Sequence, residues 1–187
     1  VTPEEFVDIY KEFGYDEALE RDPHSLSYIV EPEKGMKLFA MDTCKYEENI
    51  GKTEPVVSGA LKDETLNWIK GQIDSMKNEN CIISGMMHHN LLEHFNTQSV
   101  YFSDYVVANW DGLSTELADL GMKFVFTGHS HRSDITMKET EKGNKIYDIE
   151  TNSLVSYPSR YRLVNLNNNS LNVQVKDIDS IDYDTGE

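Results

Sequence analysis

The chain has little of what marks disulfide-rich or membrane-spanning proteins. Its 187 residues include two cysteines, Cys44 and Cys81, which stand far apart and form no CxxC pair. Neither a disulfide framework nor a cysteine-rich zinc site is therefore expected. No apolar run approaches the roughly 18 residues that a transmembrane helix needs, so we expect no membrane partner within this chain. No signal peptide is visible, and because the first residue is Val1 rather than methionine, localisation stays open.

Basic residues are also scarce. The chain has 17 lysines and arginines against 33 aspartates and glutamates, a formal net charge of −16. Such an acidic surface repels DNA and RNA, because nonspecific binding of nucleic acids depends on lysine and arginine neutralising phosphates. We therefore predict no nucleic-acid partner. A phosphate-bearing substrate would need local cations, which bound metal ions supply.

Several common catalytic and metal-binding motifs are absent. His89 and His94 have the wrong spacing for HExxH, and the cysteines form no C2H2 pattern. There is no GxSxG elbow and no GxxxxGK[ST] loop. These absences exclude zincins, zinc fingers, serine hydrolases of that type and P-loop proteins.

What the chain does have is two histidine-rich strings, each directly after a run that is typical of a buried strand. Met86–Asn90 follows the run Cys81–Gly85, and Thr127–His131 follows Lys123–Phe126. In an open α/β sheet, ligands gather just beyond the carboxyl ends of the strands. Four of the six histidines therefore fall where a metal or phosphate site would be built.

The spacing within each string suggests which rings face one another. In an extended segment, residues i and i+2 point to the same side, so His129 and His131 can face one cluster. His88 and His89 are adjacent and would point to opposite sides, so we expect one of them to bind metal directly. For a single histidine a structural role is the commoner one. Two pairs at two strand ends favour a metal cluster instead.

The remaining pattern predicts one α/β domain with short antiparallel strands at its end. The predicted elements are a helix opening at Thr2, a strand pair over 25–30 and 36–41, a helix capped by Asp63, an irregular excursion over 91–112, a short helix over 113–120, and four β segments over 135–138, 145–150, 161–166 and 171–175. Turns are expected at Lys142–Asn144 and Asn167–Asn169.

Met87–Asn90 and Gly128–His131 resemble the last two motifs of the calcineurin-like metallophosphoesterase superfamily, a strand followed by histidine and GHxH. The Trp68 segment and Thr151–Leu154 are similar to the bacterial cyclic-nucleotide-phosphodiesterase-type branch of that superfamily. The resemblance spans about residues 24–176. It implies the C-terminal half of a four-layer α/β/β/α sandwich with a mixed sheet.

The resemblance also implies roles for the histidines. His88 and His129 would bind the second metal of a pair, and His131 would bind the first. His89 would support these ligands or face the substrate, and it is the candidate catalytic residue. Two divalent ions (Mn, Fe or Zn) are implied, together with hydrolysis of a small-molecule phosphoester, with nucleotides among the candidates.

The upstream motifs of the superfamily, DxH, GDxxD and GNH[DE], are missing. Asp22-Pro23-His24 matches DxH in letters but precedes a strand, and Asp42 has no histidine two places on. We therefore interpret residues 1–178 as the C-terminal part of a metallophosphoesterase domain and 179–187 as an acidic, truncated tail. On this interpretation the chain alone is inactive or slow.

Two alternatives stay open. Instead of a fragment of a metallophosphoesterase, the chain would be a noncatalytic binding or regulatory module, or half of a split enzyme completed by a partner chain. Half a sandwich leaves apolar surface uncovered, so a homodimer or association with the missing half is expected. Among the remaining residues, His94 is a candidate substrate contact, His24 a turn residue, and Asp134 either the orienting partner of a ligand imidazole or a solvated turn residue.

Overall fold

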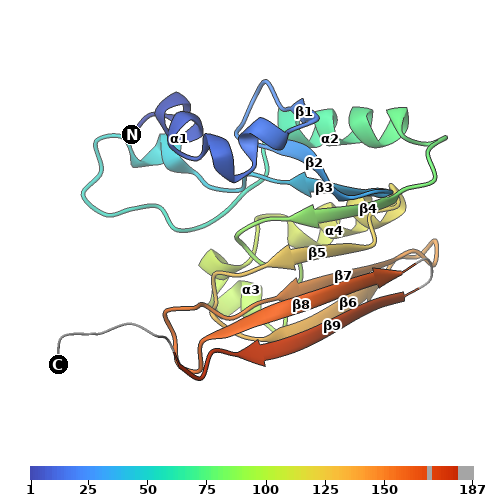
Figure 1. The fold of residues 1–187 in the computed structure, drawn as a ribbon. Helices are drawn as coiled ribbons and strands as arrows, with labels where there is room; N and C mark the ends of the chain where they lie inside the picture. Colours follow the sequence, from blue (N-terminus) through green and yellow to red (C-terminus); the bar gives the residue numbers. More distant parts are fainter. Residues whose placement is uncertain (168–169, 181–187) are drawn as a thin grey trace.

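The fold is a seven-stranded mixed sheet with helices on one face and a two-stranded ribbon on the other (Figure 1). The computed structural model describes residues 1–167 and 170–180. The strand order is β1-β2-β3-β4-β5-β7-β6. The strands are β1 (Glu20–Arg21), β2 (Tyr28–Glu33), β3 (Met36–Ala40), β4 (Ile82–Met86), β5 (Phe124–Thr127), β6 (Asp134–Glu139) and β7 (Lys145–Glu150).

Strands β3, β4, β5 and β7 run parallel to one another and form the centre of the sheet. The outer strands are antiparallel: β1 and β2 extend the sheet beyond β3, and β6 extends it beyond β7. The carboxyl ends of the four parallel strands therefore meet at one edge. That edge is where an α/β sheet places its ligands.

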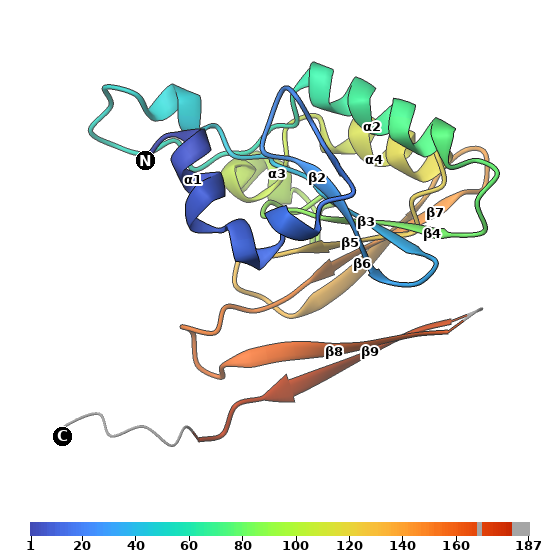
Figure 2. The same cartoon turned by 45° about the horizontal axis from the view of Figure 1, so that its top comes forward.

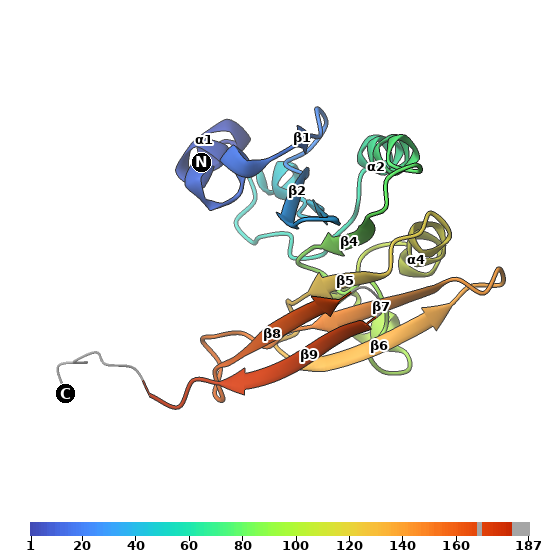
Figure 3. The ribbon, with the colours of Figure 1, turned by 45° about the vertical axis from the view of Figure 1, so that its right-hand side comes forward.

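Two helices, α2 (Asp63–Ser75) and α4 (Trp110–Asp119), cover one face of the sheet, as Figures 2 and 3 show. Their apolar residues recur at helical spacing and point inward: Ile69 and Ile73 from α2, and Leu113 and Leu117 from α4, are all at most 5% exposed. These residues join Phe39 and the other buried side chains of β3, β4 and β5 in the main hydrophobic core. Burial of this stripe fixes both helices on the sheet.

The opposite face is covered by the ribbon of β8 (Arg160–Asn167) and β9 (Ser170–Asp177) (Figure 2). Its inward side chains, Leu166, Leu171 and Val173, pack on a smaller cluster of Met36, Phe124 and Ile149. The described residues thus form three layers (helices, sheet, ribbon). The fourth layer of the expected sandwich is not among them.

The other helices are short. They are α1 (Pro3–Ile9), α3 (Gln98–Tyr101) and four single 3-10 turns, η1 (Lys11–Phe13), η2 (Tyr15–Glu17), η3 (Tyr46–Asn49) and η4 (Ser103–Tyr105). At α1 the hydroxyl of Thr2 accepts from the Glu5 amide, and the Glu5 carboxylate accepts from the Thr2 amide. This capping box confirms the helix start predicted from the sequence. None of the helices in the described ranges is long and apolar enough to cross a membrane.

The predicted α/β class is confirmed, as are the β2–β3 pair and the antiparallel partners β6–β7 and β8–β9. One detail is wrong, and another was not predicted. Asp63 is the first residue of α2, and the cap is Lys62, whose side chain makes no capping hydrogen bond. Strand β7 also runs parallel to β5, which its short antiparallel pattern did not indicate. The predicted turn at Asn167–Asn169 and the acidic tail fall partly on 168–169 and 181–187, outside the described residues.

Candidate metal centre

The two histidine strings meet at the carboxyl edge of the sheet. His88 Nε2 lies 2.8 Å from His129 Nδ1, and the ring centroids are 4.4 Å apart. The backbone holds this contact, because the Gly128 amide donates to the His88 carbonyl at 3.1 Å and the Met87 amide donates to that of Phe126 at 3.0 Å. Parallel pairing of β4 with β5 thus continues one step beyond the strands and brings the two imidazoles together.

The surroundings of this pair favour the neutral form of both rings. Burial lowers the pKa of His88, and the neighbouring charges of His129 and His131 act in the same direction. Burial also lowers the pKa of His129, again aided by His131. A neutral imidazole has a free lone pair on one nitrogen, which is the form that binds metal ions.

His89 lies in a different environment. It is 2% exposed, its Nδ1 is 2.7 Å from the Thr43 hydroxyl oxygen, and its Nε2 is 3.0 Å from the Val57 carbonyl oxygen. Its pKa is lowered to about 4, chiefly by burial. Both ring nitrogens are therefore taken up by neighbouring protein groups.

The expected opposite orientation of His88 and His89 is wrong. Strand β4 ends at Met86, so the alternation of an extended strand no longer applies at the histidines. Both rings instead approach His129, with centroid distances of 4.4 Å from His88 and 4.9 Å from His89.

His131 does not follow the extended spacing either. The backbone is left-handed at both histidines of the second string, with φ of 70° at His129 and 57° at His131. The exposed His131 places its Nδ1 3.3 Å from the Ser156 hydroxyl. The expected i, i+2 geometry therefore does not arise, because the segment turns instead of extending.

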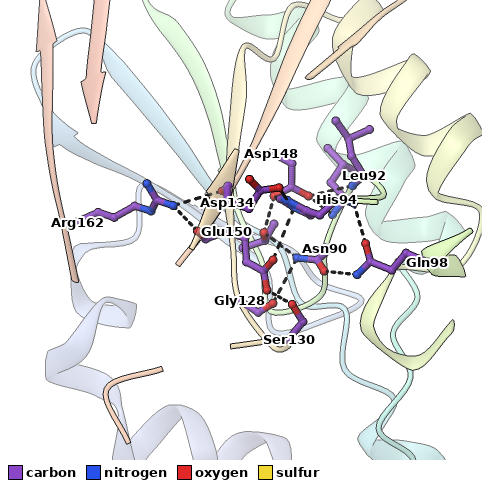
Figure 4. Close-up of polar contacts among 12 residues, drawn as sticks. Asn90, Leu92, His94, Gln98, Gly128, Ser130, Asp134, Asp148, Glu150 and Arg162 are labelled. Atoms are coloured by element: carbon purple, nitrogen blue, oxygen red, sulfur yellow. Dashed lines mark hydrogen bonds and ion pairs between the residues drawn. The ribbon is translucent and has the colours of Figure 1, made fainter. Parts of the chain in front are cut away.

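Sequence reasoning missed a buried acidic layer that contacts the segments of both histidine strings (Figure 4). His94, whose side chain is 1% exposed, places Nδ1 2.9 Å from Asp134 Oδ2. Its Nε2 lies 3.4 Å from Asp148 Oδ1 and 4.0 Å from Glu150 Oε2. Asp134 thus orients an imidazole as considered above, but that imidazole belongs to His94. The side chain of His94 is 1% exposed and paired with these carboxylates, and its role as a substrate contact stays a prediction.

Asp148, which is 0% exposed on β7, connects the segments that follow β4 and β5. Its Oδ2 accepts from the amides of Leu91 and Leu92, at 2.7 and 2.9 Å. Its Oδ1 accepts from the hydroxyl of Thr127 at 2.5 Å. The buried amide of Asn90 adds a parallel link by donating to the Thr127 hydroxyl and the Gly128 carbonyl.

Glu150 completes the layer at the end of β7. Its carboxylate accepts from the Ser130 hydroxyl, between the two histidines of the second string. The guanidinium of Arg162 donates to the Glu150 carbonyl oxygen at 2.7 Å. Burial raises the pKa of Glu150, partly countered by its bond to Ser130 and by His94. The sequence signal for this layer is Asp148 and Glu150, two acidic residues at positions i and i+2 of β7. They lie on the side of the strand that also carries the buried Ile146.

The donor set fits a metal ion in part. Two nitrogens bound tetrahedrally to one ion at ~2.0–2.1 Å lie about 3.3 Å apart, so the two rings, whose nitrogens are 2.8 Å apart, need to separate only slightly to share an ion. Within the described residues, no group of three or more His, Cys, Asp or Glu side chains is arranged to hold a metal. The pair therefore supplies two ligands, and a complete site needs further donors.

The chain matches no protein-family model, and a search of curated proteins finds no relative. Its fold is similar to the crystal structure of a dimetal phosphatase from Danio rerio, with a TM-score of 0.65 and 10% sequence identity. The alignment covers 95% of this chain and 65% of that one, so the chain spans slightly less than two thirds of the phosphatase's length. The likeness shows a metallophosphoesterase-like α/β fold.

Proposed function

We propose that this chain is part of a metal-dependent phosphoesterase. The observation that carries the proposal is the contact between His88 and His129 at the carboxyl edge of the sheet, in a fold similar to that of a dimetal phosphatase. The lowered pKa values of both rings favour the neutral form, which metal binding requires. Bound divalent ions would supply a hydroxide nucleophile and neutralise charge on the phosphoryl oxygens.

Each histidine has a place in this proposal. His88 and His129 bind the same divalent ion, and His131 belongs to the neighbouring metal position. His89 packs its ring beside that of His129. It is not a metal ligand in this proposal, because its own ring nitrogens are bonded to Thr43 and Val57. The candidate ions are Mn, Fe and Zn, all of which accept imidazole ligands.

The substrate we propose is a small-molecule phosphoester. A cavity of about 480 Å³ opens beside His88, between α1 and the carboxyl ends of β3 and β4. It is lined mainly by apolar side chains, including Phe6, Tyr28 and Met41, with Asp42 also at its wall. This volume lies within the usual range for small-molecule pockets, and its apolar wall suits the organic part of such a substrate. The strongly acidic surface argues against nucleic acid as the substrate.

Metal binding and hydrolysis test the proposal together. Isothermal titration with Mn(II) and Zn(II) should give a saturable signal for the unmodified chain. His88→Ala and His129→Ala should each weaken the affinity at least tenfold, because each removes one of two converging ligands. Release of p-nitrophenol from the bis(p-nitrophenyl) diester and from the p-nitrophenyl monoester then distinguishes phosphodiesterase from phosphomonoesterase activity.

The matched control is His24→Ala, an exposed turn histidine that should leave the metal affinity unchanged. Equal affinity in all three variants would contradict the proposed ligands. Metal binding at His88 and His129 without hydrolysis of either ester would contradict catalysis by this chain.

One observation favours a second candidate, a noncatalytic metal- or ligand-binding module. Across the described ranges, no three metal donors converge, whereas hydrolysis at a metal pair needs several ligands for each ion. Binding without turnover by this chain alone fits both candidates. The noncatalytic module predicts that turnover stays absent when the rest of the domain is added, whereas the phosphoesterase predicts that it appears.

A further inference from the structure

The buried acidic layer places ionisable side chains where apolar side chains would fill the core equally well. Asp148 and Glu150 are each 0% exposed, and the side chain of His94 between them is 1% exposed. His94 Nε2 and Glu150 Oε2 are buried without a hydrogen-bond partner. Buried charges of this kind cost several kcal/mol each to desolvate, so apolar residues would stabilise the same fold more simply.

The contacts of the layer all lead to the two histidine strings. Asp148 binds the backbone just after His88 and His89, through Leu91 and Leu92. The same carboxylate binds Thr127, two residues before His129. Glu150 binds Ser130, between His129 and His131. One strand, β7, therefore fixes both strings from a single side (Figure 4).

His94 closes the layer onto the first string. Its backbone amide donates to Gln98 Oε1 at 2.7 Å, and Gln98 Nε2 donates to Asn90 Oδ1 at 3.0 Å. Asn90 directly follows His89 and also bonds to Gly128. The segment from His88 to His94 is thus held at both of its ends.

We propose that Asp148 is a positioning residue for the histidine pair, with His94 as its counter-charge. By binding the segment after β4 and the end of β5 at the same time, Asp148 sets the separation of His88 and His129. This inference rests on the proposed function for its consequence in metal binding, but the effect on the ring geometry is independent of any metal.

The test is Asp148→Asn, which keeps the size of the side chain but removes its charge. An amide oxygen can still accept from Leu91 and Leu92, but the Thr127 hydroxyl must then accept from the NH₂ group instead of donating to a carboxylate. The charge-assisted bond that anchors the second string is thereby replaced by a weaker neutral one. In long-range ¹H–¹⁵N spectra of the metal-free chain, the ring nitrogens of His88 and His129 should shift. In the same variant the Zn(II) affinity should fall about 10- to 100-fold.

Asp119→Asn is the matched control. Asp119 also accepts three hydrogen bonds, from Thr140, Lys142 and Asn144, at the opposite end of β7. Its loss should reduce stability without moving the histidine resonances. If Asp148→Asn does not fold, Thr127→Val removes the same link without a change of buried charge, and the same shifts are expected.

Three outcomes separate the two ideas. Unchanged ring resonances in folded Asp148→Asn or Thr127→Val overturn the positioning role, whatever the metal affinity. Shifted resonances in the variant, together with tight Zn(II) binding by the unmodified chain and weaker binding by the variant, support both the positioning role and the proposed metal site. Shifted resonances in a chain that never binds Zn(II) support the positioning role and overturn the proposed function.

Discussion

His89 and His94 are five residues apart and almost equally buried, yet their pKa values move in opposite directions. The pKa of His89 is lowered to about 4, chiefly by burial. Burial also lowers the pKa of His94, but Asp148, Asp134 and Glu150 outweigh it, and the net shift is upward. The partners explain the difference: His89 meets a hydroxyl and a carbonyl, whereas His94 meets carboxylates.

Burial alone therefore does not decide the charge of a histidine in this protein. His89 is neutral and belongs with the metal-facing rings, next to His129. The carboxylates around His94 favour its charged form, and His94 belongs with the acidic layer. The two roles lie on opposite sides of one short segment, and substitutions on each side should separate them.

The largest expected effect follows the loss of the charged histidine. His94→Ala leaves Asp148 and Glu150 buried without their counter-charge, and breaking a buried pair in this way costs about 3–5 kcal/mol. Urea unfolding should show this as a lower midpoint at unchanged slope. An effect no larger than that of His24→Ala, expected to be within about 0.5 kcal/mol, would mean that the acidic layer does not depend on the charge of His94.

A smaller effect is expected from crowding the neutral histidine. In Gly59→Ala the new Cβ would lie 2.2 Å from His89 Nδ1, so the ring or the backbone must move. Overpacking of this kind typically costs about 1–3 kcal/mol. The contact between His89 and Thr43 should also be lost, which the ring resonances of His89 would report.

Gly71→Ala is the matched control for this substitution. It lies inside α2 with nothing within 4 Å of its added Cβ, so alanine should stabilise the helix by up to about 1 kcal/mol. If both substitutions raise stability, His89 is not confined as described.

The smallest effect is a dependence of stability on pH. The raised pKa of His94 means that its stabilising contribution is fully present below its unfolded pKa of about 6.5 and is lost as pH rises through its folded pKa. The lowered pKa of His89 has the opposite consequence: its contribution is present above about pH 6.5 and is lost as pH falls toward 4.

The difference in unfolding free energy between the unmodified chain and His94→Ala isolates the first contribution. We expect it to shrink as pH rises from 6 to 8, because the raised pKa of His94 lies above its unfolded value. A difference that stays constant over this range would show that the carboxylates do not raise the pKa of His94.

The meeting of His88 with His129 could be predicted from the sequence, because both follow buried strands whose carboxyl ends share an edge. The directions of the rings could not. They depend on where β4 ends and on the left-handed backbone at His129 and His131, neither of which leaves a periodic signal. His89 was assigned as a candidate catalytic residue by position alone, and its bonds to Thr43 and Val57 come from loops remote in sequence.

The acidic layer was missed for a related reason. The sequence predicts Lys145–Glu150 as a strand of an antiparallel pair, which its pairing with β6 confirms, but it carries no sign of the second, parallel pairing with β5. In the structure β7 is the last parallel strand of the sheet, with β6 beside it, and Asp148 and Glu150 are buried. Sheet membership is a tertiary property, so alternation alone does not tell which polar face is covered.

The left-handed backbone at His129 and His131 has a consequence for how this loop would change over generations of mutation. For a residue with a Cβ atom, such a conformation costs free energy that glycine does not spend. Mutation to glycine at either position would thus lower the backbone strain of the loop while removing an imidazole. Selection for stability alone would favour glycine over histidine at both positions. The two imidazoles of the GHSH string are thus present at a cost in backbone free energy.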